Sequence, residues 1–157
     1  MADERLKLAA LDQDDLGVIS VHLQDAVMKV GDMAWLPAEG RFAAVLNRFD
    51  WEHGVRSERG PWRRRRVGLS FDRVAAAQIR AIRTRAANAV LELLAIEFEP
   101  AEPPGGTVTL VFAGGAAVRL TVECIEARLA DLGPAWETRS RPGHPLDDAP
   151  EDTDGAR

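Results

Sequence analysis

A run of four arginines, Arg63 to Arg66, is the part of the sequence whose residue types and spacing most directly indicate chemistry. Guanidinium groups are permanently charged and present forked donors that suit phosphates and carboxylates. Trp51 and Trp62 lie nearby in the sequence, before the run, and offer rings that can stack on bases. The candidate anion-binding residues are Arg56, Arg59, Arg63, Arg64, Arg65 and Arg66.

The same run also has a structural interpretation. In an extended strand, Arg63 and Arg65 point to one face while Arg64 and Arg66 point to the other. At least one pair must then project beyond a core. Arginines at a solvated strand end protect an exposed sheet edge against aggregation. Both interpretations stay open from the sequence.

Charge is distributed unevenly along the chain. The formal net charge is −5, yet residues 41–85 hold twelve arginines and only four acids, a net charge of +8. Such a separation of sign creates a surface field that the net charge conceals. We therefore expect a basic patch that binds an anionic partner, either RNA or an acidic protein surface.

The residues that catalysis or metal binding would need are scattered. Asp50 and Glu52 point to one side of a strand and His53 to the other, so the three converge poorly on one metal. His22 has no recognisable nucleophile beside it. Cys124 flanks an apolar stripe, where it behaves as a small hydrophobe. We expect no catalytic residues, no metal site and no cofactor, and an enzyme is the least favoured function class.

The tryptophans support an alternative function. Trp51, Trp62 and Trp136, together with Trp35, are candidate anchors of a protein-interaction surface, including that of a homodimer, or else members of the core. This structural or interaction class is the second hypothesis, after the non-enzymatic binding module.

Hydrophobic periodicity predicts two helices. From Asp12 to about Ala26, apolar residues recur on one side at helical spacing, and Asp12 is placed to cap the first turn. From Val122 to Leu132, a second stripe ends at Gly133 and Pro134, as at a helix C-terminus.

Between these helices, turn residues at short intervals predict antiparallel strands. A short strand precedes the first helix at Arg5 to Ala10, and the others are expected near 27–36, 41–51, 63–71, 73–83, 89–98, 107–112 and 117–121. The segment 73–83 has high helix propensity, so strand and helix both remain open there. The fold class is α+β, mainly an antiparallel sheet or barrel with an N-terminal and a C-terminal helix. Seven strands followed by a helix is also the element order of pleckstrin-homology-like barrels.

Composition predicts one domain over residues 1–134. The segment 135–157 is rich in proline and acids and is expected to be a flexible tail. No apolar stretch approaches the roughly 20 residues of a membrane span, and the N-terminus lacks the pattern of a signal peptide. With a single cysteine, these features indicate a cytoplasmic protein that binds no membrane.

Four blocks of the sequence together resemble a known family. They are HLQDAVMKVGDMAWLPAEGRFAAVLNRFDWE, RRRRVGLSF, LLAIEFEP and GGTVTLVFAGGAAVRLTVECIEARLADLGPAW. The chain resembles the alphaproteobacterial domain-of-unknown-function family 2948 from about Leu6 to Trp136. The resemblance implies a bacterial cytoplasmic protein and carries no established activity, substrate or site residue.

Overall fold

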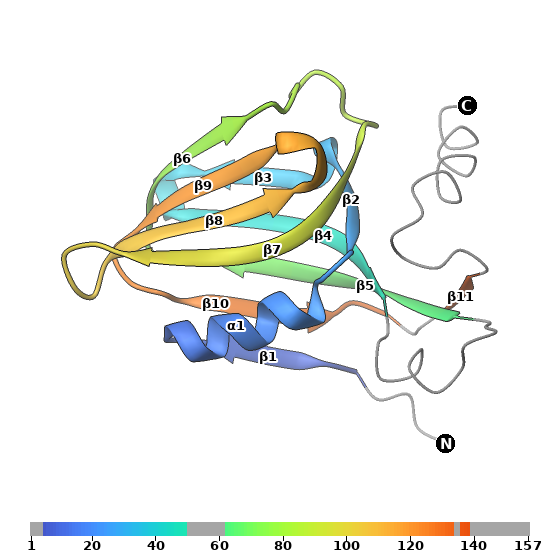
Figure 1. Cartoon of the computed structure of the whole chain (residues 1–157), viewed down its shortest axis with the longest axis horizontal. Coiled ribbons are helices and arrows are strands. Elements are labelled where there is room, and N and C mark those ends of the chain that lie inside the picture. The colour runs from blue at the N-terminus through green and yellow to red at the C-terminus, as the bar shows by residue number, and fades with distance from the viewer. Residues whose placement is uncertain (1–4, 50–61, 134–135, 139–157) are drawn as a thin grey trace.

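The computed structural model describes residues 5–49, 62–133 and 136–138, which form one strongly curved sheet around a core with a single α-helix (Figure 1). The strands are β1 Lys7–Ala10, β2 Val27–Lys29, β3 Met33–Leu36, β4 Arg41–Phe49, β5 Trp62–Phe71, β6 Val74–Arg80, β7 Val90–Pro100, β8 Gly106–Phe112, β9 Ala117–Val122, β10 Ala127–Asp131 and β11 Trp136–Thr138. The helix is α1 Gln13–His22, and the 3₁₀ turns are η1 Val30–Asp32, η2 Pro37–Glu39 and η3 Ala113–Gly115.

Neighbouring strands pair antiparallel in the order β1-β10-β5-β4-β2-β7-β8-β9-β6, with β11 beside β5 and β3 beside β4. The predicted antiparallel sheet is therefore confirmed. The barrel alternative is wrong, because β1 and β6 end the sheet and do not pair with each other in the described part of the chain. The sheet curls without closing.

One continuous apolar core fills the inside of this curl. Each strand alternates, so that β8 buries Val108, Leu110 and Phe112 while Thr109 and Val111 lie on the outside. The helix α1 lies between β7 and β1 and buries Leu16 and Ile19 (Figure 1). It thereby bridges the end strand β1 and the inner strand β7.

The N-terminal helix is confirmed, with a shorter range than predicted. The Asp12 side chain accepts a hydrogen bond of 2.8 Å from the backbone N–H of Asp15, as the sequence predicts for a cap. The helix ends at His22 because the chain turns through Asp25, whose φ is +66°. Its predicted extension to Ala26 is wrong.

Loss of the cap provides a first test of this element. Asp12→Ala is expected to lower the free energy of unfolding by about 1 kcal/mol, because the Asp15 N–H loses its acceptor. Urea denaturation followed by circular dichroism measures the change. Asp12→Asn keeps a side-chain acceptor and should stay close to the parent protein. Equal losses in both variants would contradict the capping role.

The C-terminal helix predicted over Val122 to Leu132 is wrong, since the structure has strand β10 there. Helical and strand periods coincide at Ile125, just before β10, and at Leu129 within it: both residues are buried, and both also fit a helical stripe. Ala127 and Asp131 decide between them, because both are buried at alternate positions. The pleckstrin-homology likeness rested on this helix and loses its support.

Two further segments resolve alternatives left by the sequence. Within the segment 73–83, Val74–Arg80 form β6, so the strand interpretation is confirmed there; Arg73 and Ala81 on either side of it have positive φ. The predicted strand 27–36 is two short strands separated by η1, where the backbone N–H of Gly31 donates to the Ala87 carbonyl at 2.9 Å. Within the described ranges, no helix has the length and apolarity needed to cross a membrane.

Candidate anion-binding face

The arginine run does not lie together on one surface. Arg64 and Arg65 are only 5% and 4% exposed, whereas Arg66 is exposed. The prediction that neighbours in the run point to opposite faces is confirmed by the register, in which Arg65 faces Arg48 and Arg64 faces Phe49. The strand β5 lies inside the sheet, between β10 and β4. The interpretation of the run as protection for an exposed edge is therefore wrong.

Arg65 belongs to a buried ionic cluster at the end of the core. Arg48 donates to both carboxylate oxygens of Asp131, through Nε at 3.0 Å and an Nη at 3.1 Å. The Nε of Arg65 lies 3.9 Å from Oδ2 of Asp131, which also accepts the backbone N–H of Leu6 at 2.6 Å. One carboxylate therefore ties together β4, β5, β10 and the residue before β1. A buried cation needs such a partner, because burial of an isolated charge is very costly.

Several sequence candidates lie wholly or partly beyond the described residues. Trp51, Arg56 and Arg59 fall outside them, as do Asp50, Glu52 and His53. Trp62 and Arg63 lie on β5, opposite Thr138 and Glu137 of β11, and Trp136 lies opposite Arg64. The structure places the backbone of Trp62, Arg63 and Trp136 and leaves their side chains undescribed.

Two other arginines of the basic segment have carboxylate partners. The Nε of Arg41 donates to Asp72 at 2.8 Å, and this hydrogen bond raises the pKa of Arg41 above its ordinary value. The Nε of Arg73 lies 3.7 Å from Glu126. These exposed pairs neutralise charge locally and leave little for an outside anion.

Four further arginines gather on β6, on the loop that follows it and on β9. We call the residues Arg80, Arg83, Arg85 and Arg119 the basic face; all four are exposed. No acid occurs between residues 73 and 91, and none of the four makes an ion pair within 4.0 Å to another described residue. The charge count over residues 41–85 did not predict this grouping, although the acid-free stretch 73–91 was a signal for it.

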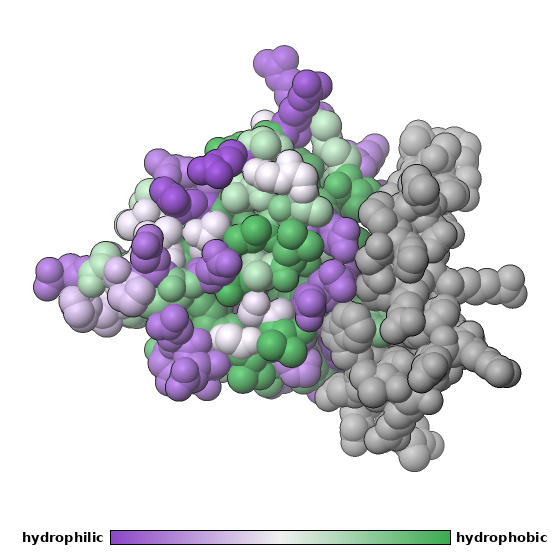
Figure 2. Space-filling model, in the orientation of Figure 1, coloured by the Kyte–Doolittle hydropathy of each residue, from purple (hydrophilic) through white to green (hydrophobic). Residues whose placement is uncertain are grey.

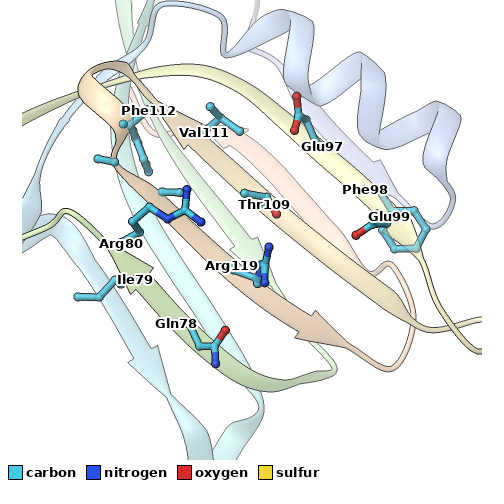
Figure 3. Close-up of a pocket in the computed structure, with 13 residues that line it drawn as sticks. Gln78, Ile79, Arg80, Glu97, Phe98, Glu99, Thr109, Val111, Phe112 and Arg119 are labelled. Carbon is cyan, nitrogen blue, oxygen red and sulfur yellow. The ribbon is translucent and has the colours of Figure 1, made fainter.

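Arg80 and Arg119 lie in a groove of about 710 Å³ on the outer face of β6, β9, β8 and β7 (Figure 3). The register aligns Glu97, Thr109, Arg119 and Gln78 in one row across these strands. Positive charge thus occupies the β6–β9 side of the groove, and Glu97 and Glu99 occupy the β7 side. Figure 2 shows apolar surface over the middle of β7 and β8 with polar residues around it. The groove is therefore polarised across its width.

Two of the groups considered for catalysis, His22 and Cys124, lie in different parts of the fold, and Asp50, Glu52 and His53 fall outside the described residues. His22 ends α1 and Cys124 follows β9, and both are half-buried. Among the described residues, no three histidine, cysteine or acidic side chains group closely enough to hold a metal ion. The described residues therefore provide charge and shape for binding.

Comparison with known proteins identifies a family without a known activity. The model of the family described as "Protein of unknown function (DUF2948)" matches residues 6–144. No curated protein and no solved structure matches the chain. The match extends beyond Trp136, where the resemblance seen in the sequence ended.

Proposed function

We propose that this chain, which belongs to the DUF2948 family, is a non-enzymatic binding module that holds an anionic partner on the basic face. The observation that carries the proposal is the pair formed by Arg80 and Arg119. Both are exposed in the groove, and neither has a carboxylate within ion-pair distance in the described part of the chain.

The spacing of this pair suits one anionic group. Arg80 faces Ala117 and Arg119 faces Gln78, so the two arginines are diagonal neighbours on adjacent strands. Diagonal neighbours lie roughly 7–8 Å apart, within reach of long side chains. Two guanidinium groups at this separation repel each other when no anion is bound. Both can donate hydrogen bonds to a carboxylate or phosphate placed between them. Binding of an anion therefore removes a repulsion and adds charge-assisted hydrogen bonds.

An acidic protein segment suits this face better than RNA. Single-stranded nucleic acid is held largely by stacking of bases on aromatic rings. The exposed large apolar residues of the described chain are all aliphatic: Leu11, Val18, Val21, Leu36, Ile79, Val90, Leu94 and Leu132. Glu97 and Glu99 would also repel a phosphate backbone that crossed the groove. A short acidic segment can stay on the β6–β9 side.

The double variant Arg80→Ser/Arg119→Ser tests the proposal. The probe is a fluorescein-labelled peptide of about ten glutamates, followed by anisotropy at low salt. Loss of two charge-assisted contacts should weaken binding about tenfold, equivalent to about 1.4 kcal/mol. Binding by the parent protein should also weaken as salt is added, because exposed charges are screened.

The matched control is Arg73→Ser/Arg128→Ser, which removes the same charge from exposed positions away from the groove. It should bind the probe nearly as the parent does. Equal weakening in both double variants would reduce the effect to net charge, and absence of binding by the parent would overturn the proposal. If a single-stranded RNA of equal length binds more tightly than the peptide, the partner of the basic face is a nucleic acid and not an acidic protein segment.

We also propose where in the cell the protein acts. A half-buried, unpaired Cys124 suits a reducing compartment, and an intracellular partner would be met there. We therefore propose a cytoplasmic protein.

A further inference from the structure

We propose that the partner is an extended protein segment with alternating acidic and apolar side chains, which adds as a strand to the outer edge of β6. This inference rests on the proposed function, because the basic face supplies its charge selectivity. It adds the conformation of the partner and the pattern of its sequence.

The edge of β6 is open for pairing. Within the described residues β6 pairs with β9 alone, and the N–H of Val74 meets the Gly40 carbonyl at 2.9 Å where the strand begins. Beyond that contact, residues 75–80 are exposed apart from Ala77, which is half-buried. An antiparallel strand directs the N–H and C=O groups of alternate residues away from its one partner. These groups form a template for an added strand.

The two faces of β6 determine which side chains the added strand needs. Gln78 and Arg80 lie on the outer face, in register with Arg119 and Ala117. Ala77 and Ile79 lie on the core side, opposite the buried Leu120 and Val118. Ile79 is nevertheless 48% exposed, at the strand that ends the sheet of the described residues.

A strand paired with this edge would place its own side chains on the same two faces alternately. Acidic side chains on the outer face would meet Arg80. Apolar side chains on the core side would cover Ile79. The segment is therefore amphipathic with period two, and about seven residues match the length of β6.

Charge also explains why the edge favours such a partner over a second copy of this chain. An arginine on an edge strand discourages pairing between identical edges, and the register shift between Val74 and Ala76 adds an irregularity. An acidic strand meets attraction at the same positions. The residues that hinder self-association thus become the residues that select the partner.

The test compares two labelled peptides of about eight residues with identical composition. In one, glutamate and valine alternate; in the other, the glutamates and the valines form two blocks. We expect the alternating peptide to bind the full chain about tenfold more tightly, because it alone presents both faces in register. Hydrogen exchange should slow at the amides of residues 75–80 when it binds.

Ile79→Ser provides a matched variant. It should weaken binding of the alternating peptide several-fold, through loss of apolar contact, and leave binding of the polyglutamate probe unchanged. Leu94→Ser removes a similarly exposed apolar side chain from β7 and should change neither. Equal affinity for both peptides, or protection outside β6, would overturn the strand addition and leave the proposed function standing.

Two other outcomes have distinct meanings. If no acidic probe binds, the proposed function and this inference fail together. If ultracentrifugation shows a dimer whose β6 amides are protected without peptide, a second copy occupies the edge and the inference is wrong.

Discussion

Asp131→Asn is expected to lower the free energy of unfolding by about 3–5 kcal/mol, because it leaves Arg48 buried without a counter-charge. The substitution keeps the size of the side chain and an acceptor for the Leu6 N–H, so the change reports mainly on charge. The two contacts of 3.0 and 3.1 Å from Arg48 and the nearby Arg65 all depend on this carboxylate. Urea denaturation followed by tryptophan fluorescence measures the loss.

Asp72→Asn is the matched control, since it removes the carboxylate of an exposed ion pair with Arg41. Its cost should stay below about 1 kcal/mol. Adding Arg48→Met to Asp131→Asn should recover part of the stability, because the stranded cation is removed as well. Similar costs for Asp131→Asn and Asp72→Asn would show that the buried cluster contributes no more than a surface pair.

Ala127→Asp is expected to cost at least about 3 kcal/mol, because it places a carboxylate in the core with no cation facing it. Ala127 is 2% exposed and lies opposite Phe71 of β5 and Ala10 of β1. Thermal and urea unfolding measure the effect. If the variant does not fold, Ala127→Ser serves in its place, with an expected cost of about 1–3 kcal/mol.

Leu132→Asp is the companion variant, because a helix and a strand make opposite predictions at these two positions. A helix over Val122 to Leu132 would bury Leu132 and expose Ala127. Leu132 directly follows β10 and is 53% exposed, so its replacement should cost no more than about 1 kcal/mol. A large loss at Leu132 with tolerance at Ala127 would contradict β10.

Local alternation made most strands predictable. β8 and β9 alternate strictly between core and outer face, and turn residues bound each of them. Over 122–132 the apolar positions fit both the helical period and the strand period. Only contacts with residues distant in sequence decide which structure forms. β10 becomes a strand because it pairs with β5 on one side and β1 on the other, a long-range choice that no short window contains.

The arginines of the candidate site also depend on contacts between residues distant in sequence, which local sequence does not reveal. The sequence predicted that Arg64 and Arg65 point to opposite faces, and they do. It did not predict that Arg65 would be buried, because the required carboxylate, Asp131, is distant in sequence and lay in a segment expected to be helical. Nor did it predict the basic face, since Arg80 and Arg119 meet only through the pairing of β6 with β9.

The burial of Arg48 and Arg65 changes the meaning of the +8 segment. Part of this charge stabilises the end of the core, and part is neutralised by Asp72 and Glu126. A net charge counted along the sequence therefore overstates what the surface offers. In the described chain, the largest group of exposed arginines without an ion pair to another described residue is the basic face.

The position of Asp131 late in the chain also constrains the order of folding during synthesis. Arg48 is synthesised 83 residues before its counter-ion, and Leu6 precedes that same side chain by 125 residues. At the ribosomal rate of about 5–20 residues per second, Arg48 waits roughly 4–17 s for Asp131. Until then β1 has no β10 to pair with, and the end of the core keeps an uncompensated cation in water. The pairing of β10 with β1 and β5, and the ion pairs of Asp131, can form only after β10 has been synthesised.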